Sequence, residues 1–271
     1  MKSKFYHLFF GKKRFQRIFE KIYLFCLSGM YYGHGGNFET SGELWVLNFI
    51  KFKLKDIDKL IFFDIGANHG KYSLELLKVF KNKKIKIHAF EPSPNTIKYF
   101  LENTKGISEI TINNFGLSDE ASNSLLYQVG NIDGLASVYN RKLDYFHNNE
   151  KVTHTESIEL RTINGYCKDN GIEIIHFMKL DIEGHELNAL KGGIEMIQKD
   201  KIDFIQFEFG ESSIDSRVFI RDFFHLLSDK YKIYRVVKDG LYELETYKQA
   251  YEIFYTVNYL AIRKGAGYTY E

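Results

Sequence analysis

Apolar runs that alternate with helix-patterned segments are the feature that most constrains the fold of this chain. Residues 60–65 (LIFFDI) form an almost continuous apolar run, which is typical of a strand buried on both faces of a sheet. A turn bounded by Gly66 and Gly70 follows, and residues 71–80 then place apolar side chains at helical spacing. A strand, a tight turn and a helix in this order form the repeating unit of parallel sheets.

The same order recurs along the rest of the chain. Residues 118–156 read as a long break of turn signals and polar residues. Further strands are expected at 85–90, 110–115, 157–160, 174–180, 202–209, 231–237 and 254–262, and helices at 94–103, 163–170, 185–198 and 215–228. This alternation predicts an α/β fold with a doubly wound, mostly parallel seven-stranded sheet and helices on both of its faces.

Polar side chains gather where the apolar runs end. In doubly wound sheets, ligands bind at the carboxyl ends of the strands. The segments that occupy this edge are DIGANHG, FEPSP, NNFGLSDE, KLDIEGHE and FEFGE. Each of them carries acidic or amide side chains, so the sequence predicts a polar ligand site along this edge.

The turn after the first strand narrows the class of ligand. Dinucleotide-binding turns read GxGxxG, and their middle glycine lets the backbone approach a pyrophosphate. Here Asn68 takes that position, and Asp64 stands just before the turn. A carboxylate repels a pyrophosphate and suits a cationic amine, so we expect S-adenosylmethionine as the cofactor. Glu91, at the end of the second strand, can bind both ribose hydroxyls of either ligand and does not separate them.

Several segments taken together resemble the FkbM-type methyltransferase family: FFDIGANHGKYSLELL, FEPSP, NNFGLSDE, LRTINGY, MKLDIEGHELNALKG, FIQFEFG and NYLAIRK. The resemblance covers residues 40–262 and implies a class I, Rossmann-like methyltransferase that uses S-adenosylmethionine. Members typically methylate oxygen atoms, often sugar hydroxyls. We therefore expect O-methylation of a small-molecule or glycan acceptor, namely a sugar hydroxyl of a bacterial surface glycan or its precursor. An NAD-dependent Rossmann oxidoreductase and a non-catalytic cofactor-binding module remain the alternatives.

The expected cofactor site combines the first turn, the start of its helix, the FEPSP segment and the end of the third strand, where class I enzymes place the adenine. Its expected residues are Asp64, Gly66, Ala67, Asn68, His69, Tyr72, Ser73, Glu91, Pro92, Asn114, Gly116, Leu117 and Asp181. For the acceptor, we expect the loop Asp133–Ser137 with the nearby side chains of Tyr127, Tyr139, Arg141 and Tyr145.

The segment KLDIEGHE carries the candidate catalytic residues Asp181, Glu183 and His185. If the strand continues, Asp181 and Glu183 point to the same side, and their repulsion raises the pKa of one of them toward that of a useful general base. His185 is the competing base, because an imidazole titrates near neutrality. Alternatively, Asp181 binds cofactor and Glu183 caps the following helix. These residues and Glu208 offer ligands for Mg²⁺, but no ligand spacing is diagnostic and we expect no metal.

The N-terminal residues differ in composition from the rest of the chain. Residues 1–21 contain seven basic side chains and one acidic side chain, and the apolar run 22–32 is shorter than the roughly 20 residues that span a bilayer. Such an arm can lie on an anionic membrane face, join two copies in a homodimer, or pack on its own domain. We expect a basic, aromatic helical arm and lead-in segment at 1–45 and a methyltransferase domain at 46–271.

The net charge and the cysteine content argue against two further classes of protein. The 37 basic and 35 acidic side chains leave a net charge of +2, which argues against a nucleic-acid partner held by a broad basic field. Two cysteines, Cys26 and Cys167, cannot build a disulfide framework. We therefore expect a cytoplasmic protein, with the arm offering a contact at the inner face of the membrane.

Overall fold

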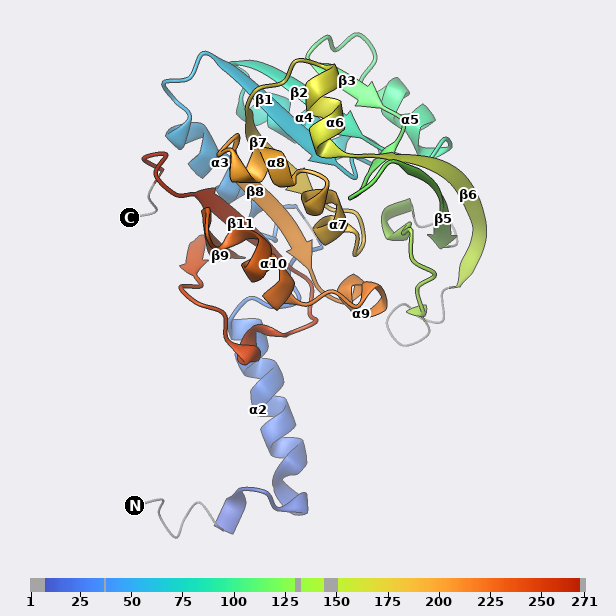
Figure 1. Ribbon diagram of the computed structural model, residues 1–271. Coiled ribbons are helices and arrows are strands. Elements are labelled where there is room, and N and C mark those ends of the chain that lie inside the picture. Colours follow the sequence, from blue (N-terminus) through green and yellow to red (C-terminus); the bar gives the residue numbers. More distant parts are fainter. Residues whose placement is uncertain (1–7, 37, 130–132, 144–150, 269–271) are drawn as a thin grey trace.

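A single large sheet forms the centre of the computed structural model, which describes residues 8–36, 38–129, 133–143 and 151–268 (Figure 1). The strand order is β10-β9-β11-β8-β7-β1-β2-β3. Strands β3, β2, β1, β7 and β8 are parallel, whereas β11 is antiparallel to both β8 and β9. The bounds are β1 Lys59–Ile65, β2 Lys84–Phe90, β3 Ile110–Asn113, β7 Ile175–Leu180, β8 Ile202–Phe209, β9 Tyr231–Val237, β10 Gly240–Glu243 and β11 Val257–Arg263.

This topology confirms the expected fold class and adds one strand to it. The sheet has eight strands rather than seven in the part of the chain that is described. The additional strand is β10, which returns along β9 after a turn at residues 238–239 and is only four residues long. Strand β1 pairs with β2 on one side and β7 on the other, so the chain reverses its direction across the sheet at β1. That reversal places a ligand site at the carboxyl ends of β1 and β7.

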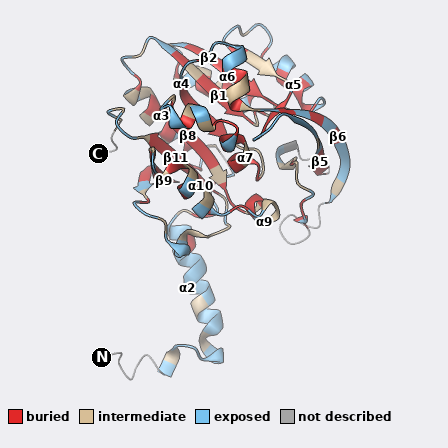
Figure 2. Cartoon of the chain, viewed as in Figure 1, coloured by how far each residue is buried: buried red, intermediate tan, exposed pale blue. Residues whose placement is uncertain are grey.

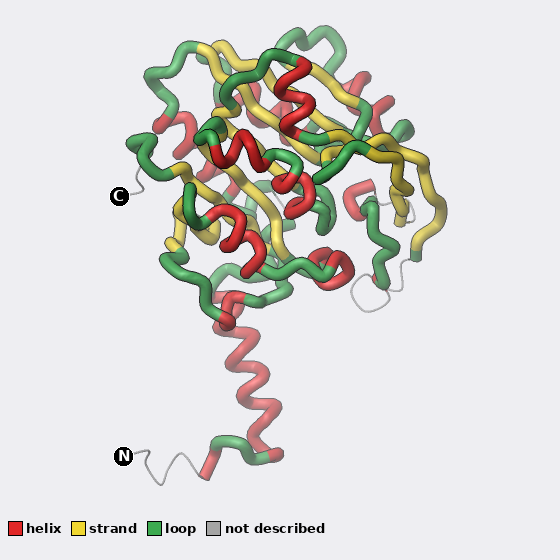
Figure 3. Tube along the Cα trace, viewed as in Figure 1, coloured by secondary structure: helices red, strands yellow, loops and turns green. Residues whose placement is uncertain are grey.

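Helices cover both faces of the sheet, as Figure 3 shows. The adjacent side chains of Phe62 and Phe63 point into opposite cores, because successive strand residues alternate between faces. Helices α3 Glu43–Lys53, α4 Lys71–Val79 and α5 Thr96–Asn103 pack against the face of Phe62. Helices α6 Ile163–Asp169, α7 Glu186–Lys191, α8 Ile194–Gln198 and α10 Ile220–Leu227 pack against the face of Phe63.

Two of the expected long helices are interrupted. The helix expected at 185–198 divides into α7 and α8 at Gly192, where an added Cβ would lie 1.9 Å from the carbonyl oxygen of Ser118. The helix expected at 215–228 becomes α9 Ser212–Ser216 and α10, because Arg217 adopts a left-handed φ of 58° between them. At Gly192 the chain turns to fit the neighbouring segment of Ser118.

A second, smaller sheet occupies much of the expected break at 118–156, and that part of the prediction was wrong. Its order is β4-β6-β5, with bounds β4 Gly116–Leu117, β5 Ser122–Val129 and β6 Val152–Arg161. Leu126, Ile158 and Leu160 form its small apolar core. A short 3₁₀ turn, η2 Asp133–Leu135, precedes a bridge between Tyr127 and Ser137. The exposed positions of β5 and β6 are largely polar, which gives these strands a weak apolar signal.

The N-terminal arm is helical, as expected. It consists of η1 Lys13–Phe15 and α2 Gln16–Gly29, and it projects from the body rather than packing along it (Figures 1 and 2). Within α2 only Leu27 is buried. Among the described residues, no helix is long and apolar enough to cross a bilayer. The proposed boundary at 45/46 falls inside α3, and the division into an arm and a catalytic domain stays a prediction.

Candidate active site

A pocket of about 630 Å³, counting its part open to solvent, lies at the carboxyl ends of β1, β2 and β7. The small sheet and the loop after η2 form its other walls. The structure thus brings together segments that are far apart in the sequence. The expected site residues that line this pocket are Gly66, Asn68, Glu91, Pro92, Gly116, Leu117, Asp181, Glu183 and His185.

The turn after β1 is fitted closely to the end of β7. Gly66 has a φ of +84°, and a Cβ added there would lie 1.9 Å from the carbonyl oxygen of Asp181. The Asp181 amide donates to the carbonyl oxygen of Ile65 at 3.0 Å, which holds the two strand ends together. Asn68 also has a positive φ, 48°, and its buried Oδ1 has no hydrogen-bond partner in the described chain. A buried acceptor of this kind indicates a donor from a ligand or water.

Glu91 braces the same turn from the end of β2. Its Oε2 accepts the backbone N–H of Asn68 at 3.0 Å, and its Oε1 accepts that of Ser93 at 2.9 Å. Burial raises the pKa of Glu91 to about 7, although these two hydrogen bonds act in the opposite direction. Each carboxylate oxygen has a second lone pair, so Glu91 can still accept a hydroxyl from a ligand.

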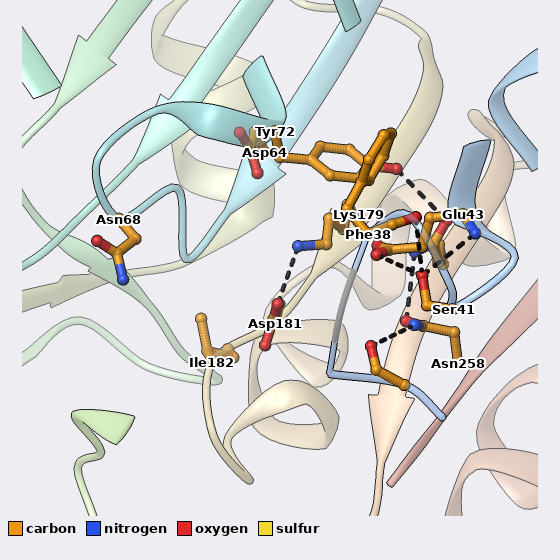
Figure 4. A network of polar contacts seen from close by, with 12 residues as sticks. Phe38, Ser41, Glu43, Asp64, Asn68, Tyr72, Lys179, Asp181, Ile182 and Asn258 are labelled. Carbon is orange, nitrogen blue, oxygen red and sulfur yellow. Dashed lines mark hydrogen bonds and ion pairs between the residues drawn. The ribbon is translucent and has the colours of Figure 1, made fainter. Parts of the chain in front are cut away.

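Asp64 lies behind the turn instead of lining the pocket. Its fully buried carboxylate accepts the hydroxyl of Ser73 at 2.6 Å, and in the sheet Asp64 stands opposite Lys179. The Lys179 ammonium lies 2.9 Å from Asp181 and 4.4 Å from the centre of the Tyr72 ring (Figure 4). Burial raises the pKa of Asp64, and the positive charge of Lys179 opposes that rise. The other carboxylate oxygen of Asp64, Oδ1, is buried and has no hydrogen-bond partner in the described chain. Asp64, Tyr72 and Ser73 do not line the pocket, and their part in cofactor binding stays a prediction.

The hydroxyl of Tyr72 donates to Gln206 at 3.5 Å, which extends this polar network to the lead-in segment. Glu43, buried at the start of α3, accepts hydrogen bonds from Ser41 at 2.9 Å and Gln206 at 2.8 Å. Gln206 also donates to Asn258, so the network connects α3 to β8 and β11. Figure 4 shows Glu43 and Ser41 beside Asn258, on the far side of Lys179 from Asn68. Glu43 and Lys179 were not predicted, although Lys179 stands two residues before Asp181 and hence on the same side of β7.

Three other expected cofactor residues lie at the margin of the site. Ala67 is buried in the core beneath the turn. The ring of His69 lies 5.1 Å from that of Tyr99. The side-chain amide of Asn114 donates to the carbonyl oxygens of Glu91 at 2.9 Å and Pro92 at 3.1 Å, which fixes the FEPSP segment to the end of β3.

An acidic cluster adjoins the pocket, and two of its members, Asp181 and Glu183, line it. Ligand atoms of Asp181, Glu183 and Glu208 all lie within 4.8 Å of one another. Burial, followed by repulsion from Asp181 and Glu183, raises the pKa of Glu208 well above its ordinary value. Asp181 contacts the ammonium of Lys179, and Glu183 contacts the guanidinium of Arg141, and each cation offsets part of the negative charge of the cluster. That pairing accounts for the close approach of the carboxylates, and the absence of a metal stays a prediction.

Glu183 reaches the cluster through a turn rather than through strand alternation. Strand β7 ends at Leu180, and Glu183 has a left-handed φ of 52°. Its Oε2 accepts a hydrogen bond from Arg141 at 2.5 Å, and Arg141 also contacts Glu211 at 3.3 Å and Asp215 at 3.7 Å. Burial raises the pKa of Glu183 to about 8, against the opposing effect of the Arg141 guanidinium. A carboxyl with this pKa is suited to accept a proton near neutral pH.

His185 is differently placed, because both of its ring nitrogens already have partners. Nε2 lies 2.9 Å from the Ser118 hydroxyl and Nδ1 lies 3.0 Å from the Tyr139 hydroxyl. Ser118 donates its own proton to Asp119 at 2.8 Å, so Nε2 is the donor and Nδ1 accepts from Tyr139. Burial lowers the pKa of His185 to about 4. The ring is thus neutral and has no free nitrogen that could accept a proton from an acceptor hydroxyl.

The loop after η2 docks on this turn through alternate residues. Ser137 donates to the carbonyl oxygen of Glu183 at 2.8 Å, Tyr139 bonds His185, and Arg141 pairs with Glu183. The chain bends at Val138 and Tyr139, and the side chains of all three residues reach the same turn. Arg141, expected to recognise the acceptor, is buried and holds Glu183 instead. Tyr145 lies outside the described residues.

Comparison with known proteins agrees with this geometry. The sequence profile of the methyltransferase FkbM domain matches residues 64–233. The chain belongs to the FkbM methyltransferase family. The FkbM match spans β1 to β9 and therefore includes every side chain that lines the pocket.

Two curated proteins and a crystal structure are similar to this FkbM chain at low identity. The 2-O-methyltransferase NoeI of Sinorhizobium fredii is 22% identical over 162 residues, 57% of this chain and 65% of NoeI. The hexuronic acid methyltransferase AglP of Haloferax volcanii is 24% identical over 175 residues, 64% of this chain and 65% of AglP. The chain thus spans less than two thirds of either relative. The structure of methyltransferase FkbM from Methylobacillus flagellatus is 19% identical with a TM-score of 0.45, and the match covers 75% of this chain and 44% of that one.

Proposed function

We propose that this chain is an S-adenosylmethionine-dependent methyltransferase that methylates a sugar hydroxyl of a bacterial surface glycan or its precursor. The observation that carries the proposal is one pocket that joins the turn of Asn68 and Glu91 to the half-buried carboxyl group of Glu183. Membership of the FkbM family supports methyl transfer. The names of the two curated relatives, a 2-O-methyltransferase and a hexuronic acid methyltransferase, support a sugar hydroxyl as acceptor.

The residues around the turn fit the cofactor. Glu91 has lone pairs for the ribose hydroxyls, and Oδ1 of Asn68, which has no partner among the described residues, can accept a hydrogen bond from the cofactor. Pro92, Gly116 and Leu117 supply an apolar wall suited to an adenine ring. S-adenosylmethionine supplies an electrophilic methyl group when bound.

Glu183 is the residue that we assign as general base. Its Oε2 is held by Arg141, so its Oε1 is the atom that would accept the proton of the acceptor hydroxyl. The loop of Ser137 and Arg141 fixes the position of this carboxylate, which matters because proton transfer requires a hydrogen-bonded geometry. His185 has a positioning role in this assignment, since it connects Tyr139 of the loop to Ser118.

The proposed place of action is the cytoplasm. Both cysteines are free, and Cys26 is exposed to solvent. Unpaired, exposed thiols are typical of a reducing compartment.

Ligand titration of the purified chain tests the cofactor assignment. S-adenosylhomocysteine should raise the melting temperature, and at 100 times its dissociation constant it should add about 2.7 kcal/mol to the free energy of unfolding. NAD and NADP should leave the melting temperature unchanged. Stabilisation by NAD alone would favour the oxidoreductase alternative and overturn the proposal.

Mass spectrometry of surface glycans tests the acceptor. Glycans from a strain that lacks this gene should lose one methyl group on a sugar residue, and the complemented strain should regain it. Unchanged glycans, together with intact binding of S-adenosylhomocysteine, would reject the glycan acceptor while leaving the methyltransferase assignment in place.

A further inference from the structure

The helix α2 has an apolar face that the other described residues leave exposed. This apolar face of the arm consists of Ile18, Ile22, Phe25 and Cys26, which lie three to four residues apart and so on one side of the helix. The exposed fractions are 54% for Ile18, 51% for Ile22 and 79% for Phe25. Figure 2 shows α2 as an exposed rod away from the body. An exposed apolar stripe of this kind marks a binding surface.

Positive charge borders the apolar face. Arg17 and Lys21 lie one turn apart at its edge, and Lys12, Lys13 and Arg14 precede the helix. Glu20 is the sole acidic residue between residues 8 and 29. The surface therefore combines apolar contact with a local excess of positive charge. That combination is typical of helices that lie in the headgroup region of an anionic bilayer.

The C-terminal end of α2 and the residues that follow it are attached to the body of the protein. Leu27 is buried in the main core, and the hydroxyl of Tyr32 accepts a hydrogen bond from Arg235 at 2.8 Å. The amides of Gly33 and Gly35 both donate to the carbonyl oxygen of Thr256 at 3.1 Å. Thr256 in turn packs against Gly210, the residue directly after β8. The arm thus joins the body beside the strand end that carries Glu208.

We infer that the apolar face of the arm docks in the plane of an anionic lipid membrane. A second copy of the chain fits this surface less well, because it would bring five basic side chains of one arm against five of the other. In an anionic bilayer, the acyl chains cover the apolar face and the negative headgroups pair with the basic side chains. Such docking also holds the carboxyl edge of the sheet, and with it the proposed active site, near the bilayer surface.

Vesicle co-sedimentation of the full chain tests this inference. Vesicles of phosphatidylcholine with phosphatidylglycerol should bind the protein about tenfold more tightly than phosphatidylcholine alone, and added salt should weaken the binding. Ile22→Glu should reduce binding to the anionic vesicles about tenfold, because it places a charge within the apolar face.

Gln16→Glu is the matched control, since it adds the same charge on the opposite side of α2 and should have a much smaller effect. Both variants should retain wild-type stabilisation by S-adenosylhomocysteine, which shows that the body is folded. Equal binding of both variants to anionic vesicles would overturn the inference. So would absence of vesicle binding together with a dimer, measured by light scattering, that Ile22→Glu dissociates.

Discussion

Glu183→Gln tests the proposed chemistry most directly. The substitution keeps the size of the side chain and its acceptor oxygen for Arg141, but it removes the carboxylate that would take the proton. Positioned proton transfer contributes about 10²–10⁴-fold to a rate, so turnover should fall by that factor. This corresponds to about 2.7–5.4 kcal/mol in activation free energy. Affinity for S-adenosylhomocysteine should change little, because the cofactor contacts come from other segments.

The structure offers a closely matched control, Glu211→Gln. Arg141 contacts Glu183, Glu211 and Asp215, so each glutamine variant leaves two carboxylates on the same guanidinium. Both variants remove one negative charge from one cluster, and they differ in whether the proposed base is lost. Glu211→Gln should therefore retain turnover within about tenfold of the wild type, below the usual effect of losing a base.

The pH dependence supplies a second measurement on the same residue. Because burial raises the pKa of Glu183 to about 8, the single-turnover rate of the wild type should increase with pH until that value and then level off. The Glu183→Gln variant should lack this rise. The reasoning is refuted if Glu183→Gln loses less than about tenfold in the single-turnover rate, or if it keeps the same pH profile as the wild type.

Three further predictions concern the turn, the cofactor and the histidine. Gly66→Ala should lower the free energy of unfolding by about 1–3 kcal/mol more than Gly106→Ala in urea titrations. Both glycines have a φ above +80°, but an added Cβ at Gly66 meets the carbonyl oxygen of Asp181, whereas one at Gly106 meets nothing within 4 Å. Equal losses would contradict the close fit to Asp181. Glu91→Ala should weaken binding of S-adenosylhomocysteine by about 1.5–3 kcal/mol in calorimetry, and wild-type affinity would remove Glu91 from the cofactor site. Folding lowers the pKa of His185 from 6.5 to about 4, so the unfolded chain binds a proton at a higher pH than the folded chain does. The free energy of unfolding should therefore decrease as pH falls from 6.5 toward 4. His185→Gln should lessen this decrease between pH 7 and pH 5, and an unchanged decrease would show that other groups cause it.

The parts of the fold with strong local signals could be predicted from the sequence. The apolar run of β1, the glycine turn and the spacing of α4 are local features, and their order implies a parallel sheet that is reversed at β1. The small sheet had no such signal, because the sequence SNSLLYQV of β5 buries few of its side chains. Likewise, the break between α7 and α8 depends on the carbonyl group of Ser118, which is distant in sequence from Gly192. Contacts of that kind are set by tertiary packing.

The residues of the candidate site likewise divide into those that could be predicted from local sequence and those that could not. Residues whose role follows from their backbone position, such as Gly66 and Glu91, lie where the strand order placed them. Asp64 was expected to face a cationic ligand because of its place before the turn. Its actual neighbours depend on the register of β1 against β7, which puts Lys179 directly opposite and leaves the carboxylate buried. A sequence shows which charges are present, but the pairing of strands decides which of them meet.

The ion pairs of the site decide how its charges are balanced and which residue can act as a base. The carboxylates of Asp181, Glu183 and Glu208 lie close enough to repel one another strongly, and a cation or a proton must offset that repulsion. Lys179 and Arg141 supply part of this charge from within the chain, and each of them contacts one carboxylate of the cluster. The pKa of Glu208 is raised well above its ordinary value, which favours the protonated form. The pKa of Glu183, about 8, lies near the range in which a general base works. The assignment of Glu183 rather than His185 as base therefore depends on the partners of both residues, which no local pattern in the sequence reveals.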